Sequence, residues 1–395
     1  MIQRATRSVY VVFILAGVVI SSFLSRVPQI RDLLELQPGP LGRLLLMTAI
    51  GSLISLPLSG LIVHRLGAAR TVTLMAFVGM SGLGLAAVGT EVSVIMVGAG
   101  LLFFGFGAGA WDVAMNVEAA AVEQQLDRSI MSRFHAAFSV GTVGGALVGA
   151  GANALDIAPI VHLLVVVSVV VVTVPVMCRG FMPAGTDEHE EQQQARSPLV
   201  AWTERRTVLI GLFVLCITFA EGTGNDWLGV ASIDGYGTSD ALGSVAYVVF
   251  VVAMTLGRWF GPGTLDRFGR VPVLRVSAAC AFVGVVIVVF GPSFGTALVG
   301  IVLWGLGTAL GFPTGMSAAA DDPQYAAGRV SVVATVGYVA FLAGPSLIGF
   351  IGDHTGVLRA LTLTATVLGL GFMVAGATKP LVPTAGPAPA DDVVS

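Results

Sequence analysis

The sequence predicts an all-α integral membrane protein with twelve transmembrane helices in two pseudo-symmetric six-helix halves. Three observations predict this fold: a scarcity of charge, twelve long apolar stretches, and a repeat of motifs about 200 residues apart. Only 11% of the 395 residues are charged and 55% are hydrophobic, whereas a soluble domain carries about 25% charged residues. A soluble surface needs those charges and a lipid-facing surface does not, so the composition indicates a membrane protein.

Each apolar stretch approaches the roughly 20 residues that a membrane helix needs. The stretches cover 8–28, 41–63, 70–90, 93–117, 131–153, 158–178, 207–230, 241–263, 271–292, 294–317, 329–351 and 357–378. Backbone groups in lipid must bond within the protein, and the alternating pattern of a membrane barrel is absent, so we predict helices. Residues 1–28 resemble a signal peptide but lack a small-residue cleavage site, and we interpret them as the first span.

The distribution of lysine and arginine predicts the orientation, because these residues favour the cytoplasmic side. When both termini are placed in the cytoplasm, fifteen of the 20 basic residues lie inside. The outer segments hold only four, and Arg258 lies within the eighth span; the four are Arg26, Arg31, Arg43 and Arg359. The bias predicts a multi-pass protein of a bacterial-type cytoplasmic (inner) membrane with both termini inside.

Two polar segments divide the chain into domains. We predict an N-terminal half at 1–178, a cytoplasmic linker at 179–206, a C-terminal half at 207–378 and a disordered cytoplasmic tail at 379–395. The linker contains Asp187, Glu188 and His189. These could bind a metal ion, but a run of charges in a linker is more commonly solvated, and we predict no metal site.

The two halves repeat each other. His64-Arg65-Leu66-Gly67 follows the second span, and Asp266-Arg267-Phe268-Gly269 follows the eighth. Gly105 and Gly107 in the fourth span match Gly305 and Gly307 in the tenth; Gly144 and Gly149 match Gly344 and Gly349. Six-helix repeats of this kind have a substrate site at their interface, near the middle of the membrane.

These loops resemble the signature of the major facilitator superfamily, Gly, three residues, Asp-Arg, one residue, Gly-Arg. The first copy, Gly60 to Arg70, has His64 at the acidic position, and the second has Pro262 in place of the leading glycine. The resemblance extends along the whole chain in topology. It implies a secondary transporter that works by alternating access, functions as a monomer and needs no cofactor.

A narrower resemblance lies in the fourth and fifth spans. Trp111-Asp112-Val113-Ala114-Met115-Asn116 and Ser132-Arg133-Phe134-His135 resemble a bacterial branch that includes rhizopine-transport-protein-like carriers, with fucose permease as a more distant relative. The stretch from Glu221 to Trp227 also resembles that branch. The branch has a broad substrate range and does not name a substrate. We expect a small organic solute and proton coupling, with either uptake of a sugar- or cyclitol-like compound or efflux of a drug or metabolite.

Charged side chains within apolar spans are costly and point to function. Asp112 and Asn116 are four residues apart and therefore share one helix face. Burial favours the protonated form of a carboxyl, so Asp112 is the first candidate for a proton-coupling residue. The alternative is a structural acid bonded to a neighbouring helix.

The seventh span has a second such pair, Glu221 and Asn225, followed by Asp226. At 1.5 Å per residue, Glu221 lies roughly 21 Å from the start of the span, near the middle of the membrane. We predict a coupling or ligand-binding role for Glu221, and place Asp226 nearer the outer surface.

Other candidates have less support. Arg26 could pair with Asp226, contact substrate, or extend to the surface. His135 could transfer protons or be a structural histidine. Trp111 and Trp304 could stack on a cyclic ligand or simply pack.

The loop motifs predict a gate at the cytoplasmic side. Its expected members are Gly60, His64, Arg65, Gly67, Arg258, Asp266, Arg267, Gly269 and Arg270. Asp266 is expected to pair with Arg267 or Arg270 as a two-state latch. His64 in the first copy would make the corresponding latch weaker or sensitive to pH.

Other function classes have little support. A net charge of −3 gives no basic surface for nucleic acid. Three scattered cysteines fit neither a disulfide framework nor a zinc site. The sequence contains no nucleotide-binding loop or metalloprotease motif, so a membrane-embedded enzyme is a distant alternative, as is a non-transporting receptor or scaffold.

Overall fold

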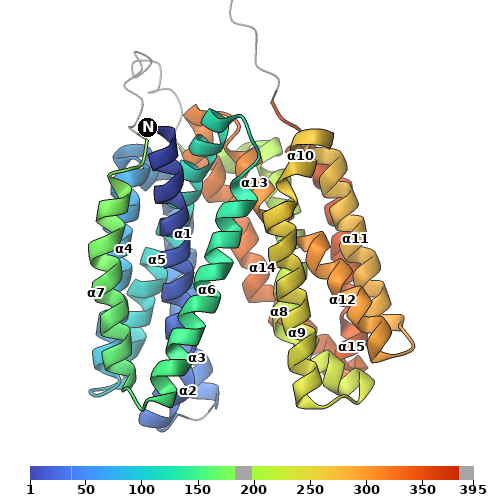
Figure 1. Cartoon of the computed structure of the whole chain (residues 1–395), viewed down its shortest axis with the longest axis horizontal. Helices are drawn as coiled ribbons and strands as arrows, with labels where there is room; N and C mark the ends of the chain where they lie inside the picture. Colours follow the sequence, from blue (N-terminus) through green and yellow to red (C-terminus); the bar gives the residue numbers. More distant parts are fainter. Residues whose placement is uncertain (37, 183–197, 382–395) are drawn as a thin grey trace, which may run out of the picture.

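The structure is a computed structural model that describes residues 1–36, 38–182 and 198–381. The first half contains α1 (Ile2–Leu24), the short α2 (Val27–Leu33), α3 (Pro38–Leu66), α4 (Ala68–Gly89), α5 (Val94–Leu126), α6 (Met131–Ala154) and α7 (Pro159–Cys178). These helices form one group in Figure 1. The polar segment around Asp187, Glu188 and His189, and most of the tail, lie outside the described residues.

The second half contains η2 (Pro198–Thr203), α8 (Arg205–Tyr236), α9 (Asp240–Phe260), α10 (Pro262–Phe268), α11 (Arg270–Phe290), α12 (Phe294–Thr308) and α13 (Gly311–Ala319). It continues with η3 (Pro323–Tyr325), α14 (Ala326–Thr355), α15 (Val357–Ala360), α16 (Thr362–Val374) and η4 (Ala375–Thr378). The all-α membrane fold is therefore confirmed.

Within the described residues, ten helices are long and apolar enough to cross a membrane, or eleven if α9 and α10 count as one bent span. The remaining predicted span, 329–351, lies inside the thirty residues of α14. The structure is thus consistent with twelve spans. Three spans are interrupted: α9 and α10 meet at a bend of 48°, the tenth span is divided into α12 and α13, and the twelfth into α15, α16 and η4.

The predicted glycine repeat corresponds to matched helix contacts. A Cβ atom on Gly105 would lie 1.9 Å from the backbone oxygen of Thr48 on α3, and one on Gly305 would lie 2.5 Å from that of Phe250 on α9. Small residues allow such close approach between membrane helices. In each half, the fourth span therefore packs backbone to backbone against the second.

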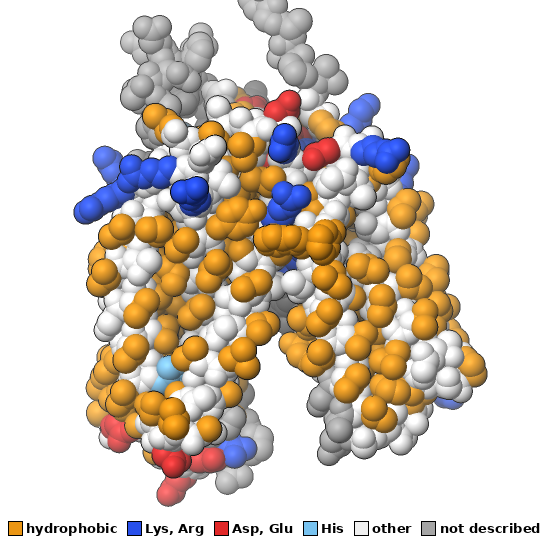
Figure 2. Space-filling model, in the orientation of Figure 1, with side chains coloured by type: hydrophobic (Ala, Val, Ile, Leu, Met, Phe, Trp, Pro, Cys, Tyr) orange, Lys and Arg blue, Asp and Glu red, His pale blue; other side chains and the backbone are white. Residues whose placement is uncertain are grey.

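On the face shown in Figure 2, apolar side chains cover the middle of the molecule and charged side chains gather at its two ends. We call the end that carries the N-terminus, Arg70, Arg128, Arg206 and Arg270 the arginine end. The halves contact each other most extensively through α3 with α14, and also through α5 with α14, α6 with α9, and α13 with α5 and α6. At the opposite end, Figure 2 shows a hollow between the two halves.

Candidate functional site

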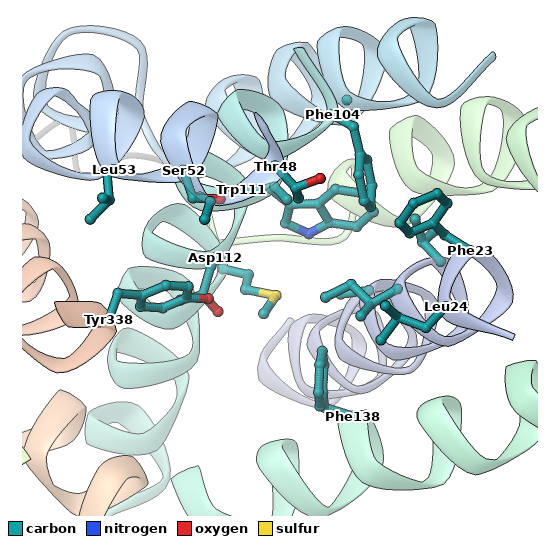
Figure 3. A pocket seen from close by; sticks show the side chains of 18 of the residues that line it. Phe23, Leu24, Thr48, Ser52, Leu53, Phe104, Trp111, Asp112, Phe138 and Tyr338 are labelled. Atoms are coloured by element: carbon teal, nitrogen blue, oxygen red, sulfur yellow. The ribbon is translucent and has the colours of Figure 1, made fainter. Parts of the chain in front are cut away.

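A cavity of about 440 Å³ lies between the two halves. Most of its lining residues come from α1, α3, α4, α5 and α6 of the first half, including Asp112 and Trp111 (Figure 3). The second half contributes Glu221, Arg258, Phe312 and Tyr338, one from each of four helices. A cavity therefore lies at the interface between the halves, and the first half contributes most of its lining.

Asp112 and Asn116 interact as their spacing predicts. The Nδ2 group of Asn116 donates to the Asp112 carboxylate at 3.2 Å and to the Asp112 backbone oxygen at 2.9 Å. The amide oxygen of Asn116 lies 3.1 Å from Nε2 of His135 on α6. The phenol of Tyr338 on α14 points at the Asp112 carboxyl and hydrogen bonds to it (Figure 3). One polar chain thus links α14, α5 and α6.

His135 lies in an aromatic environment. The rings of Phe13 and Phe312 meet it edge to face at centroid distances of 5.2 and 5.3 Å. Phe312 belongs to the second half, so this contact crosses the interface. The arrangement fixes the imidazole against Asn116, and His135 thereby belongs to the same cluster as Asp112.

Glu221 and Arg258 form a buried ion pair at the cavity. Nη2 of Arg258 donates to the two carboxylate oxygens of Glu221 at 2.8 and 2.9 Å. Arg258 also donates to Ser139 Oγ across the interface at 3.3 Å and to the Ala309 backbone oxygen at 3.4 Å. Ala309 lies in the break between α12 and α13, where its carbonyl is available to a side-chain donor.

The position of Arg258 differs from the prediction that placed it in the gate. Counting along a straight helix puts Arg258 about two turns from Asp266. However, α9 ends at Phe260, and the 48° bend turns α10 away. Arg258 therefore stays with the cavity while Asp266 reaches the arginine end.

Several other candidates lie elsewhere. Arg26 is almost fully buried and donates to the backbone oxygens of Gly149 and Ile157, instead of pairing with Asp226 or lining the cavity. Trp304 donates from Nε1 to the Ala220 backbone oxygen at 3.2 Å and is a packing residue. Asn225 is half-buried, and Asp226 is exposed; neither belongs to the cavity lining.

Sequence reasoning missed Tyr338, Phe312 and Ser139. A phenol inside the apolar run of α14 was a usable signal for Tyr338, because buried hydroxyls require partners. Phe312 and Ser139 have no such signal, since an aromatic and a serine are common in any membrane helix. Their roles depend on which helices face each other.

The second loop motif lies at the arginine end and crosses the interface. The Asp266 carboxylate accepts from the backbone N–H of Ser129, just before α6, at 2.9 Å. Gln124 Nε2 donates to the Ala320 backbone oxygen at 2.6 Å. Ser317 donates to Glu123, whose other oxygen accepts from the first N–H groups of α6. These contacts close the arginine end.

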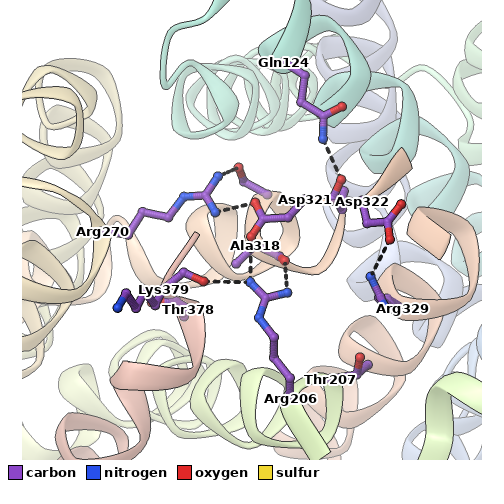
Figure 4. A network of polar contacts seen from close by, with 12 residues as sticks. Gln124, Arg206, Thr207, Arg270, Ala318, Asp321, Asp322, Arg329, Thr378 and Lys379 are labelled. Atoms are coloured by element: carbon purple, nitrogen blue, oxygen red, sulfur yellow. Dashed lines mark hydrogen bonds and ion pairs between the residues drawn. The ribbon is translucent and has the colours of Figure 1, made fainter. Parts of the chain in front are cut away.

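The expected pairing of Asp266 with Arg267 or Arg270 differs from the structure. Arg270 instead donates to Asp321 at 2.5 Å, and Arg206 donates to the other Asp321 oxygen at 2.6 Å (Figure 4). The guanidinium of Arg267 stacks over Phe268. Asp321 follows α13 in the chain. It pairs with Arg270, which the motif alone would pair with Asp266.

The first loop motif closes the same end by backbone packing. A Cβ on Gly60 would lie 2.9 Å from the Ala327 backbone oxygen, and Ser331 Oγ donates to the Leu56 oxygen at 2.6 Å. His64 and Arg65 are exposed. Gly67 and Gly269, the matched glycines of the two motifs, both have positive φ, 75° and 80°, a conformation that favours glycine.

Replacing Asp266 by alanine is expected to open the arginine end more often, because the backbone N–H of Ser129, just before α6, loses its hydrogen-bond partner in the other half. In a background without native cysteines, Ala320→Cys would report on this opening, since Ala320 is buried there. We expect its alkylation rate to rise about two- to fivefold, a change of about 1 kcal/mol or less. Asp234→Ala, which removes an exposed carboxylate elsewhere, is the control. Equal rates in both variants would show that the Asp266 contact does not hold the halves together.

The fold and its interfacial cavity define a polytopic membrane transporter of the two-half type. The model of the Major Facilitator Superfamily matches residues 9–345. The chain belongs to this superfamily.

Relatives agree with this assignment. The chain is 30% identical over 382 residues to the uncharacterized transporter y4wD of Sinorhizobium fredii, covering 96% of this chain and 97% of the relative. It is 27% identical to the membrane protein MosC of Rhizobium meliloti, covering 93% and 87%. Among solved structures, FucP in the outward conformation superposes with a TM-score of 0.82 at 16% identity, covering 94% of this chain and 98% of FucP. This last similarity concerns the fold.

Proposed function

We propose that this protein is a proton-coupled secondary transporter of a small organic solute, with Asp112 as the coupling carboxyl. The observation that carries the proposal is the position of Asp112: it lines the cavity and bonds to Asn116 of its own half and Tyr338 of the other. Protonation changes a carboxylate from an acceptor into a donor. A proton on Asp112 would therefore alter the contact between the halves.

The closed arginine end and the hollow at the other end support alternating access. In this proposal the arginine end faces the cytoplasm, the two halves are those separated by the linker, and the protein acts as a monomer in an inner membrane. The contacts of Asp266, Gln124 and Ser317 break when that end opens. FucP is described as a fucose:proton symporter, which makes proton coupling and a sugar- or cyclitol-like solute reasonable first tests.

Efflux of a drug or metabolite is the second candidate. It is favoured by the apolar and aromatic residues of the cavity wall, such as Phe23, Phe104 and Phe138. Both candidates use the same cavity and the same carboxyl, and they differ in the direction of solute movement.

Asp112→Asn is expected to abolish solute movement driven by a pH gradient, because an amide cannot exchange a proton. The measurement is flux in liposomes with an imposed pH gradient and a panel of sugars, cyclitols and cationic dyes. Asp234→Asn removes an exposed carboxylate outside the cavity and is the matched control. Gradient-driven flux in Asp112→Asn equal to that of the control would overturn the assignment of Asp112.

A further inference from the structure

We infer that the solute is an organic amine, a monocation with an apolar body that occupies the cavity at Asp112 in exchange for a proton. This inference rests on the proposed function and specifies the substrate class of the same site. It comes from the balance of charge in the cavity and from the chemistry of its wall.

The cavity has one carboxyl without a counter-ion. The lining residues from α1, α3, α4 and α13 have no ionisable side chain. On the other elements the ionisable groups are Asp112 on α5, His135 on α6, Glu221 on α8, Arg258 on α9 and Tyr338 on α14. Glu221 and Arg258 neutralise each other at 2.8 Å. Among the described residues, no ion pair involves Asp112.

The partners of Asp112 favour an exchangeable charge. Asn116 and Tyr338 are neutral donors that stabilise its ionised form, whereas an unpaired ionised group in a site of low dielectric is costly. A carboxylate that is hydrogen-bonded by neutral donors but has no fixed counter-ion is therefore best balanced by a cation that can bind and dissociate. A proton and an organic cation are two such occupants, and either one excludes the other.

The cavity wall favours the cation's apolar body. Phe23, Phe104, Trp111 and Phe138 surround the space beside Asp112 (Figure 3), and aromatic faces attract ammonium groups. The wall offers few hydrogen bonds to a neutral polyol, since Ser52 Oγ already donates to the Gly105 backbone oxygen at 2.9 Å.

Two buried side-chain atoms of the wall have no hydrogen-bond partner among the described residues. They are Thr48 Oγ1 and the buried Trp111 Nε1. They could bond to one or two hydroxyl or ether oxygens on the body of the amine. An anion is disfavoured, because Arg258 already donates to Glu221, Ser139 and Ala309.

The exchange is balanced. The neutral Asp112 carboxyl and the ammonium ion combine to give a carboxylate–ammonium pair and one proton released to solution. Amine binding therefore releases a proton, and lowering the pH weakens amine binding because protonated Asp112 gains no charge pair. The drop reaches at most about tenfold per pH unit, since one proton is exchanged.

The experiment compares three probes of similar size on the purified full chain: 2-phenylethylamine, 2-phenylethanol and phenylacetate, with myo-inositol as a neutral polyol. Binding is measured by quenching of tryptophan fluorescence, and proton release by a pH dye in weakly buffered detergent solution. We expect the amine to bind at least about tenfold more tightly than the alcohol, a difference of about 1.4 kcal/mol, and to release a proton. Asp112→Asn should lose both effects, and Asp234→Asn, which removes an exposed carboxylate, should retain them.

Tighter binding of the alcohol, phenylacetate or myo-inositol would overturn the inference, as would amine binding without proton release. Amine binding and proton release unchanged in Asp112→Asn would also overturn it. These results are separable from failure of the proposed function, which is judged by gradient-driven flux in liposomes. Proton-coupled transport of myo-inositol through Asp112 would support the proposed function and overturn the inference that the solute is an amine.

Discussion

Replacing Arg258 by methionine will abolish transport and markedly lower the thermal stability of the protein. The substitution keeps much of the side-chain volume but leaves Glu221 buried without a counter-charge; the two side chains are only 6% and 12% exposed. Removing one partner of a buried ion pair costs about 3–5 kcal/mol. The Ser139 and Ala309 contacts are lost as well. The measurement is the melting temperature of the purified protein, with flux in liposomes.

The matched control is the double variant Glu221→Gln with Arg258→Met. It removes both charges, so stability should recover largely, because no unpaired charge is left in the cavity. Transport should stay lost, since the link from α9 to Ser139 is absent. If the single variant melts like the unmodified protein, the ion pair does not contribute to the stability of the fold.

Gly105→Ala is expected to destabilise the first half or prevent its folding. The added Cβ would lie 1.9 Å from the Thr48 backbone oxygen, and backbone atoms on α3 cannot rotate away as a side chain could. Separating α3 from α5 also disturbs the wall that holds Trp111 and Asp112. Overpacking costs about 1–3 kcal/mol, and a backbone clash of this kind belongs at the upper end. Yield of monodisperse protein in detergent and its melting temperature measure the effect.

Gly144→Ala is the control for that substitution. Gly144 lies on α6 with no atom within 4 Å of an added Cβ, so alanine should be tolerated. It should even stabilise the helix by up to about 1 kcal/mol, because glycine costs more backbone entropy. Similar losses for both substitutions would mean that helix flexibility, and not close packing, explains the glycines.

Features encoded along a single helix could be predicted from the sequence. Hydropathy located the spans because lipid requires apolar side chains, and the four-residue spacing of Asp112 and Asn116 predicted their contact because helix geometry sets it. The repeated glycines also predicted matching helix contacts, since Gly105 and Gly305 each pack against the backbone of a neighbouring helix. In these cases the physical cause lies within one segment or one repeat.

Features that depend on how the helices face each other could not be predicted from the sequence. The sequence places Arg258 about two turns from Asp266 and so predicts that both belong to the gate, but the bend after Phe260 separates them. Asp321 gave no signal that it would bind Arg206 and Arg270, which are more than 50 positions away in the chain. The cluster forms only when the ends of α8, α11 and α13 are brought together.

The uneven division of the cavity has a consequence for how this protein can diversify. Most of the surface that would contact a solute is built from residues up to and including Phe138, while the second half supplies Phe312, Tyr338, the ion pair and the cluster around Asp321. Mutations that reshape the pocket wall thus fall mostly in the first half, whereas mutations that change the Glu221–Arg258 pair or the Asp321 cluster fall in the second. Substitutions in the pocket wall could therefore change which solute binds while the Glu221–Arg258 ion pair and the Asp321 cluster stay the same.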